Sequence, residues 1–135
     1  MRIVTPAEYA IEQRLRDKLT SFPLYKHSHW ILVYLKDNDH KYISYGPHPN
    51  RQLNEGKTTF DVEIKIGTVD ILSFFIEKGK TRRGYGKLLY EVIEGFSRDL
   101  GYRRLVTSPS GQGHKFWPKM GFRESPDEGL LEKII

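Results

Sequence analysis

The sequence of 135 residues contains no cysteine. This absence excludes a disulfide framework, a zinc site built on thiolates and a cysteine nucleophile. Long apolar runs are also missing, because no stretch approaches the roughly 18 residues of a membrane-spanning helix, and the mean hydropathy is −0.57. A helix signal begins so early that the apolar core of a signal peptide has no room. We therefore expect a cytoplasmic protein that does not associate with a membrane.

The charge balance is basic. The chain has 22 Lys and Arg residues against 17 Asp and Glu residues, which gives a formal net charge of +5. This surplus favours an anionic ligand or partner but falls well short of a polybasic tail. A single hydrophobic core suits roughly 100 to 200 residues, so the length predicts one domain over residues 1–135.

A helix is expected near the start of the chain and an antiparallel meander after it. Thr5, Pro6 and Glu8 form a capping box with proline in the first turn, and an apolar stripe continues to about residue 20. The continuous apolar run at residues 30–35 predicts a buried strand. Strict alternation at residues 58–66 predicts a strand with one face in water. Further strands are expected at residues 41–45 and 69–76.

The second half of the chain adds a strand, glycine loop, helix and strand unit. The helix follows Gly84, carries its apolar residues on one face and ends at Gly101. The fold class is therefore mixed α/β (α+β), with a largely antiparallel central sheet flanked by helices. The remaining short elements are expected at residues 103–107, 111–119, 122–125 and 130–135.

The loop before this helix has the features of an anion site. Glycines at positions 84 and 86 let backbone N–H groups turn toward a ligand, at the helix end whose dipole favours negative charge. The nucleotide-binding patterns G-x-x-x-x-G-K-[ST] and G-x-G-x-x-G are absent. A phosphate or pyrophosphate is favoured, because cationic side chains lie beside the glycines. They are Lys80, Arg82, Arg83 and Lys87.

Two spaced motifs resemble the GNAT superfamily of acyl-CoA-dependent N-acetyltransferases. Residues 81–86, Thr-Arg-Arg-Gly-Tyr-Gly, take the register of the family signature [QR]-x-x-G-x-[GA] after an apolar strand. Residues 116–122, Phe-Trp-Pro-Lys-Met-Gly-Phe, are similar to the family's F-Y-x-x-x-G-F. The resemblance covers residues 68–125. It departs from the family pattern at Thr81, Ser110 and Trp117, where Gln or Arg, Asn and Tyr are usual.

The resemblance implies a splayed pair of strands that forms a groove for acetyl-CoA. Main-chain groups of Phe74 and Ile76 are then expected to bind the pantetheine arm, and the following loop to hold the pyrophosphate. The loop residues are Thr81, Arg82, Arg83, Gly84, Tyr85, Gly86 and Lys87.

Acyl transfer to an amine needs a base for the ammonium proton and an acid for the leaving thiolate. The resemblance makes Asp70 the first candidate base, because the histone-acetyltransferase branch carries a Glu there. Glu63, or Asp61, on the preceding strand is the alternative. Trp117 stands where many family members place the acid tyrosine, and an indole N–H is not acidic. The remaining candidates for the acid are His114, Tyr85, a water molecule or release without an acid.

Three functions stay open. The first is an N-acetyltransferase that moves an acetyl group from acetyl-CoA to a primary amine of an unidentified protein or small molecule, by direct attack in a ternary complex. The second is an inactive CoA-binding adaptor, which the departures at Thr81, Ser110 and Trp117 favour. The third is a small basic nucleic-acid-binding domain, for which no motif is present. A homodimer is compatible with each of these three functions.

Two further expectations concern metal and acceptor. His27 and His29 share one strand face, but no third ligand lies at a recognised spacing, so no metal is expected. Residues 46–57, a polar loop, are expected to form a wall on the acceptor side.

Overall fold

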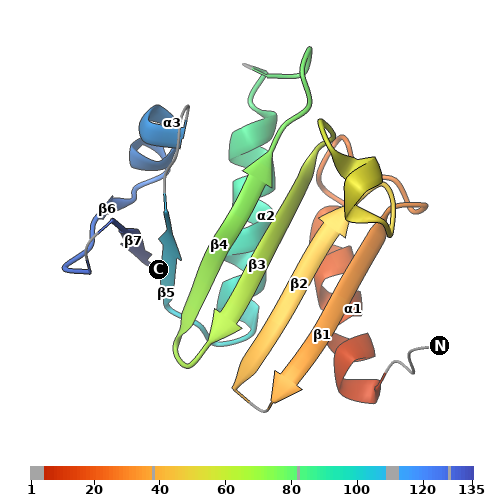
Figure 1. Ribbon diagram of the computed structural model, residues 1–135, viewed down its shortest axis with the longest axis horizontal. Coiled ribbons are helices and arrows are strands. Elements are labelled where there is room, and N and C mark those ends of the chain that lie inside the picture. Colours follow the sequence, from red (N-terminus) through yellow and green to blue (C-terminus); the bar gives the residue numbers. More distant parts are fainter. Residues whose placement is uncertain (1–4, 38, 82, 109–112, 128) are drawn as a thin grey trace.

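The described residues form a seven-stranded sheet in the order β1-β2-β3-β4-β5-β7-β6 (Figure 1). The computed structural model describes residues 5–37, 39–81, 83–108, 113–127 and 129–135. The strands are β1 (Trp30–Asp37), β2 (His40–Gly46), β3 (Thr59–Lys65), β4 (Thr68–Phe75), β5 (Arg104–Thr107), β6 (Arg123–Glu124) and β7 (Leu131–Ile134). The helices are α1 (Pro6–Leu19), α2 (Tyr85–Asp99) and α3 (Gly113–Lys119), with a 3-10 turn η1 (Arg51–Asn54).

Helix α1 begins at the predicted capping box. The Glu8 N–H donates to the Thr5 hydroxyl at 3.1 Å, and the Thr5 N–H donates to the Glu8 carboxylate at 3.3 Å. Ile11, Leu15 and Leu19 along one face of the helix are buried. The sequence prediction of an amphipathic first helix is therefore confirmed.

Both long helices cover the same face of the sheet. Figure 1 shows α1 behind β1 and β2, and α2 behind β3 and β4. The core fills the space between these layers, and its fully buried members include Leu15, Ile43, Ile64, Leu89 and Ile93. We call this side of the sheet the covered face.

The opposite side of β1 to β4 is the open face, over which Figure 1 shows no helix of the described chain except η1 at one end. Two rows of residues that face one another on adjacent strands define it. The first row is Tyr34, Tyr42, Glu63 and Asp70, and the second is Leu32, Ser44, Asp61 and Ser73.

Strand β1 lies at the edge of the sheet, so the prediction of a buried strand is wrong for one of its faces. Ile31 and Val33 are buried, whereas Trp30, Leu32 and Tyr34 are 38–50% exposed. A continuous apolar run predicts burial on both faces. Here the helices cover only one of them, and the alternate side chains lie on the open face.

At strand β4 the sheet changes from antiparallel to parallel pairing. The strand pairs with β3 along its length, but it runs parallel to β5 only from Thr68 to Ile71. Adjacent residues of β3 face Ile71 and Ser73, so Leu72 is an extra residue in a bulge. Beyond the bulge β4 continues to Phe75 without β5 as a partner. The predicted mixed, largely antiparallel fold with a splayed strand pair is confirmed.

The described residues contain no helix that is both long and apolar enough to cross a membrane.

Candidate functional site

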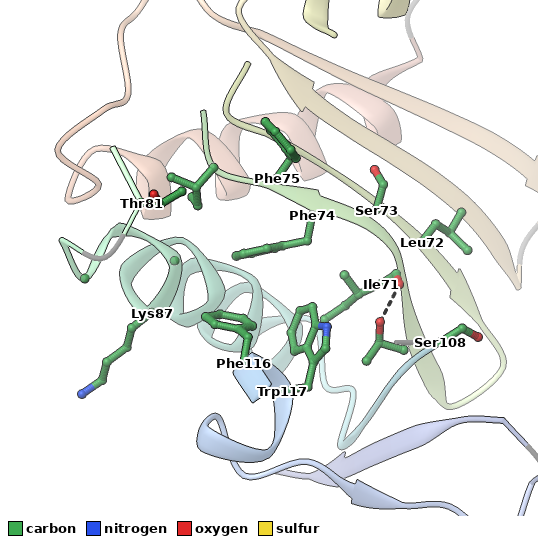
Figure 2. A pocket seen from close by; sticks show the side chains of 14 residues that line it. Ile71, Leu72, Ser73, Phe74, Phe75, Thr81, Lys87, Ser108, Phe116 and Trp117 are labelled. Carbon is green, nitrogen blue, oxygen red and sulfur yellow. Dashed lines mark hydrogen bonds between the residues drawn. The ribbon is translucent and has the colours of Figure 1, made fainter. Parts of the chain in front are cut away.

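A groove of about 640 Å³ lies where β4 and β5 diverge (Figure 2). Its walls come from β4 and the loop after it, the end of β5, the first turn of α2, and α3. Thr107 at the end of β5 donates its hydroxyl to the Ile71 carbonyl at 3.1 Å, which fixes the point where the two strands part. The predicted acetyl-CoA residues that line the groove are Phe74, Ile76, Thr81, Gly84, Gly86 and Lys87.

Other members of the predicted loop lie away from the groove walls. Tyr85 is directed toward the segment that follows α1, because its ring packs edge-on against Phe22 with the centroids 6.5 Å apart. Arg83 is exposed and is not among the described lining residues. Arg82 lies outside the described residues.

The N-terminus of α2 is uncapped at the groove. Its N-cap residue is Gly84, no side chain of the described residues caps the end, and the first turn contains no acidic residue. The first helical hydrogen bond runs from the Leu88 N–H to the Gly84 carbonyl. The N–H groups ahead of Leu88 therefore lack helical acceptors, and together with the helix dipole they form an anion site.

The two glycines of the loop serve different needs. Gly84 has a φ of 81°, a left-handed conformation that side chains disfavour, and a Cβ there meets nothing within 4 Å. Gly86 has an ordinary φ, but a Cβ there lies 3.0 Å from the Phe116 ring. The first glycine therefore sets the backbone turn, and the second lets α2 and α3 approach each other.

Aromatic rings form the apolar wall of the groove, and they belong to the core as well. Figure 2 shows Phe74 of β4 beside Phe116 and Trp117 of α3. The Phe74 and Phe116 rings stack with centroids 5.3 Å apart, and Trp117 lies at the same distance from Phe74. Trp117 is only 5% exposed and also packs against Tyr90 and Phe122. Trp117 therefore belongs both to the core and to the wall of the groove.

The two predicted catalytic carboxylates lie on the open face. Asp70 has a side chain 19% exposed, with the Lys65 Nζ 3.8 Å away. Burial raises the pKa of Asp70, Lys65 opposes this rise, and Glu63 on the neighbouring strand adds to it. Glu63 contacts the imidazole of His40 and lies 3.9 Å from the Lys36 Nζ. Neither carboxylate is among the described residues that line the groove.

Asp61 is the carboxylate that reaches a groove residue. The Ser73 hydroxyl donates to its Oδ2 at 2.7 Å, and Ser73 lines the groove. Arg51 of η1 donates to the same oxygen at 2.9 Å. The alternation of β3 placed Asp61 on a wet face, but its side chain is only 8% exposed because these partners cover it. Arg51 and Ser73 carry no sequence signal, because their role depends on packing between distant segments.

The other sequence candidates add no second site. The side chain of His114 and the whole of Ser110 lie outside the described part of the chain. The His29 Nδ1 lies 2.7 Å from the Tyr45 hydroxyl, within an aromatic cluster. Among the described residues, no three His, Cys, Asp or Glu side chains gather in a way that could hold a metal ion.

No protein-family model and no curated protein matches the chain. Several solved structures do match the chain. The PaiA N-acetyltransferase from Thermoplasma acidophilum, in complex with coenzyme A, is 21% identical over 72% of this chain, with a TM-score of 0.50. The chain spans 62% of the length of that structure.

Two further structures match with scores in the same range. An acetyltransferase from Bacillus cereus is 18% identical over 100% of this chain and 96% of its own, with a TM-score of 0.53. A GNAT family acetyltransferase from Elizabethkingia anophelis with acetyl-CoA bound is 14% identical over 82% of this chain and 100% of its own, with a TM-score of 0.52. The protein therefore has the fold of the GNAT acetyltransferases, as its two motifs indicate.

Proposed function

We propose that the protein is an N-acetyltransferase that transfers the acetyl group of acetyl-CoA to a primary amine. The observation that carries this proposal is the groove between β4 and β5, which joins an aromatic wall to the uncapped N-terminus of α2. An apolar channel that ends in backbone N–H donors matches a molecule with an apolar arm and a pyrophosphate.

The groove residues fit acetyl-CoA part by part. Backbone N–H groups from Gly84 to Lys87 bind the pyrophosphate, and the Lys87 ammonium and the Thr81 hydroxyl assist. Arg82 and Arg83, beside the same loop in sequence, add positive charge. The pantetheine arm follows the main chain of Phe74 and Ile76, against the aromatic wall. Acetyl-CoA supplies an activated thioester.

The open face supplies the base. Asp70 is the first candidate and Glu63 the second, as they lie opposite each other on β4 and β3. The raised pKa of Asp70 makes its carboxylate a stronger base than that of an exposed aspartate. Leu72, the extra residue of the bulge, lies outside the ladder and lines the groove. The backbone N–H of Leu72 can therefore polarise the thioester carbonyl.

The reaction proceeds by direct attack. The amine nitrogen bonds to the thioester carbon, the carbon–sulfur bond breaks, and the ammonium proton passes to the carboxylate. The sequence has no cysteine to form an acyl-enzyme through a thiol. Trp117 cannot protonate the thiolate, so the thiolate takes its proton from water.

A thiol-release assay tests the proposal. Purified protein is mixed with acetyl-CoA and a panel of primary amines, and free CoA thiol is followed with a disulfide reagent. We expect saturable release that depends on one class of amine. No amine-dependent release above the rate without protein contradicts the proposal.

A second candidate is a CoA-binding adaptor without catalysis. The observation that favours it is that Asp70 and Glu63 are absent from the described groove lining, while a tryptophan occupies the place of the acid. This adaptor predicts acetyl-CoA binding by calorimetry together with no thiol release for any amine.

A further inference from the structure

Asp61 is a buried carboxylate with one oxygen left without a donor. Its Oδ2 accepts from Ser73 and Arg51, at 2.7 and 2.9 Å. Its Oδ1 is sealed from solvent and has no hydrogen-bond partner among the described residues. A buried acceptor without a donor is costly, and more so when it carries charge. The site therefore has capacity for a further N–H or O–H donor.

The outermost partner of this carboxylate is Arg51. The Arg51 side chain is 65% exposed, whereas that of Asp61 is 8% exposed. The second arm of its guanidinium donates to the Tyr42 hydroxyl at 3.0 Å. An exposed side chain can turn into water at little cost, so Arg51 is the replaceable member of the cluster.

The backbone that carries Arg51 is held in place. The side chain of Asn54, at the end of η1, exchanges two hydrogen bonds of 2.8 Å with the main chain of His48. Asn54 also lies against Gly46, where a Cβ would come within 2.6 Å of its amide nitrogen. The loop therefore presents Arg51 to Asp61 from a fixed position, and only the side chain needs to move.

The cluster is continuous with the groove. Ser73 lies opposite Asp61 on β4 and lines the groove. Asp70 and Glu63 differ from Asp61 in two ways. Neither makes a hydrogen bond to a described groove residue, and neither has a buried oxygen that lacks a donor among the described residues. Asp61 is thus the open-face carboxylate placed to receive a ligand that approaches the groove.

We propose that Asp61 binds the alkylammonium group of the acceptor, and that Arg51 is an internal cation that occupies this place until the acceptor displaces it. The inference rests on the proposed function and names its acceptor class as cationic primary alkylamines. An ammonium has three N–H donors, so two of them can reach Oδ1 and Oδ2 of Asp61 while the third remains for the base. Exchange of one cation for another keeps the buried carboxylate paired at every stage.

The test measures the binding of n-butylammonium chloride by NMR titration of the full chain. Arg51→Ala removes the internal competitor, so we expect this variant to bind n-butylammonium at least threefold more tightly than the unmodified protein. Adding Asp61→Asn to Arg51→Ala is expected to abolish that gain. Arg98→Ala is the matched control, because Arg98 also donates to a carboxylate, that of Glu94, at 3.1 Å.

A second measurement is independent of the alkylamine. Arg51→Ala leaves a space the size of a guanidinium, so we expect it to bind ethylguanidinium, while the unmodified protein and Arg98→Ala do not. The proposal is overturned if Arg51→Ala, shown to be folded by its NMR spectrum, gains no affinity for n-butylammonium, whatever its affinity for ethylguanidinium. It is also overturned if the gain persists with Asn at position 61.

Calorimetry with acetyl-CoA on the same proteins separates this inference from the proposed function. Acetyl-CoA binding without any gain for n-butylammonium in Arg51→Ala rejects the acceptor subsite and leaves the proposed function standing. No acetyl-CoA binding to the unmodified protein rejects the proposed function, and with it the role of Asp61 as an acceptor site.

Discussion

Two candidate sites border strand β4, the groove and the carboxylates of the open face, and they are made of different chemical groups. The groove beside β4 is made largely of backbone N–H groups and of rings that also belong to the core, such as Phe74 and Trp117. On the open face, carboxylates stand in the sheet and each is held by a cation, as Asp61 is by Arg51. A site made from backbone and core is inseparable from the fold. A site made from charge pairs can change its partner while the fold stays the same.

The largest effect is expected on the open face, from Asp70→Asn. Removing the candidate base lowers kcat/KM at neutral pH by about 10²- to 10⁴-fold, because the ammonium proton loses its acceptor. The thiol-release assay measures the loss, and acetyl-CoA affinity is unchanged. Asp99→Asn is the control, since Asp99 also pairs with a lysine, at 3.1 Å.

The pH profile sharpens this prediction. Burial raises the pKa of Asp70, so the base is ionised above that pKa and activity falls as the pH drops through it. The acid limb should therefore lie above the usual range of an aspartate and disappear in Asp70→Asn. A variant with full activity and the same acid limb would transfer the role to Glu63.

The largest effect on acetyl-CoA binding is expected at the groove, from Gly84→Glu. The new carboxylate lies at the N-terminus of α2, the proposed pyrophosphate site, and the φ of 81° strains any side chain. The strain lowers stability in the free and the bound protein alike, whereas repulsion between the two anions weakens binding by about 1–2 kcal/mol, so acetyl-CoA affinity falls about 5- to 30-fold by calorimetry.

Gly101→Glu is the matched control for Gly84→Glu. It has a φ of 87°, equally open space for a Cβ, and a position just beyond the other end of α2. We expect it to bind acetyl-CoA like the unmodified protein. Equal losses in both variants would show that strain alone, and no anion site at Gly84, explains the effect.

A third comparison concerns stability. Trp117→Ala removes a ring that packs against Phe74, Tyr90 and Phe122, so the free energy of unfolding falls by about 3–5 kcal/mol. Leu32→Ala on the open face removes a side chain 38% exposed, and we expect a loss below about 1 kcal/mol. Urea unfolding measures both. Equal losses would contradict the distinction between the two faces.

The smallest expected effect is the pH response of His29. Burial lowers the pKa of this imidazole, and the cations Lys26 and Arg16 lower it further, against Glu77. The unfolded chain therefore binds this proton at a higher pH than the folded protein does. Stability is fully present above the usual histidine pKa and decreases as the pH falls through it.

Urea unfolding at pH 8 and pH 5.5 tests this response. His29→Gln should lose less stability between the two values than the unmodified protein. His27→Gln, which changes an exposed imidazole two residues away, should retain the full difference. If His29→Gln loses as much stability on acidification as the unmodified protein, the titrating group lies elsewhere.

The sequence is most informative where structure is local. The turn at Gly84, the cap at Thr5 and the amphipathic phase of α2 depend on neighbouring residues, so spacing alone predicts them. Even here the direction of a side chain depends on its position around the helix. Tyr85 belongs to the loop motif, but its place in the first turn of α2 directs its ring to Phe22, just after α1.

The features that sequence reasoning could not provide depend on how distant segments meet. An apolar run at β1 does not reveal that only one of its faces is covered, because that depends on the strand order. The contact between Arg51 and Asp61 depends on the placement of η1, which the Asn54 hydrogen bonds to His48 determine. Alternation predicts the side of the sheet on which Asp61 lies, but not what covers it.

The most direct test of the account is the initial rate of thiol release over a matrix of acetyl-CoA and amine concentrations. If acetyl-CoA occupies the groove and the amine binds on the open face, both are bound when the acetyl group moves. Double-reciprocal lines that intersect to the left of the rate axis are then expected. Parallel lines would show that an acetylated protein forms before the amine binds, and would contradict direct transfer across β4.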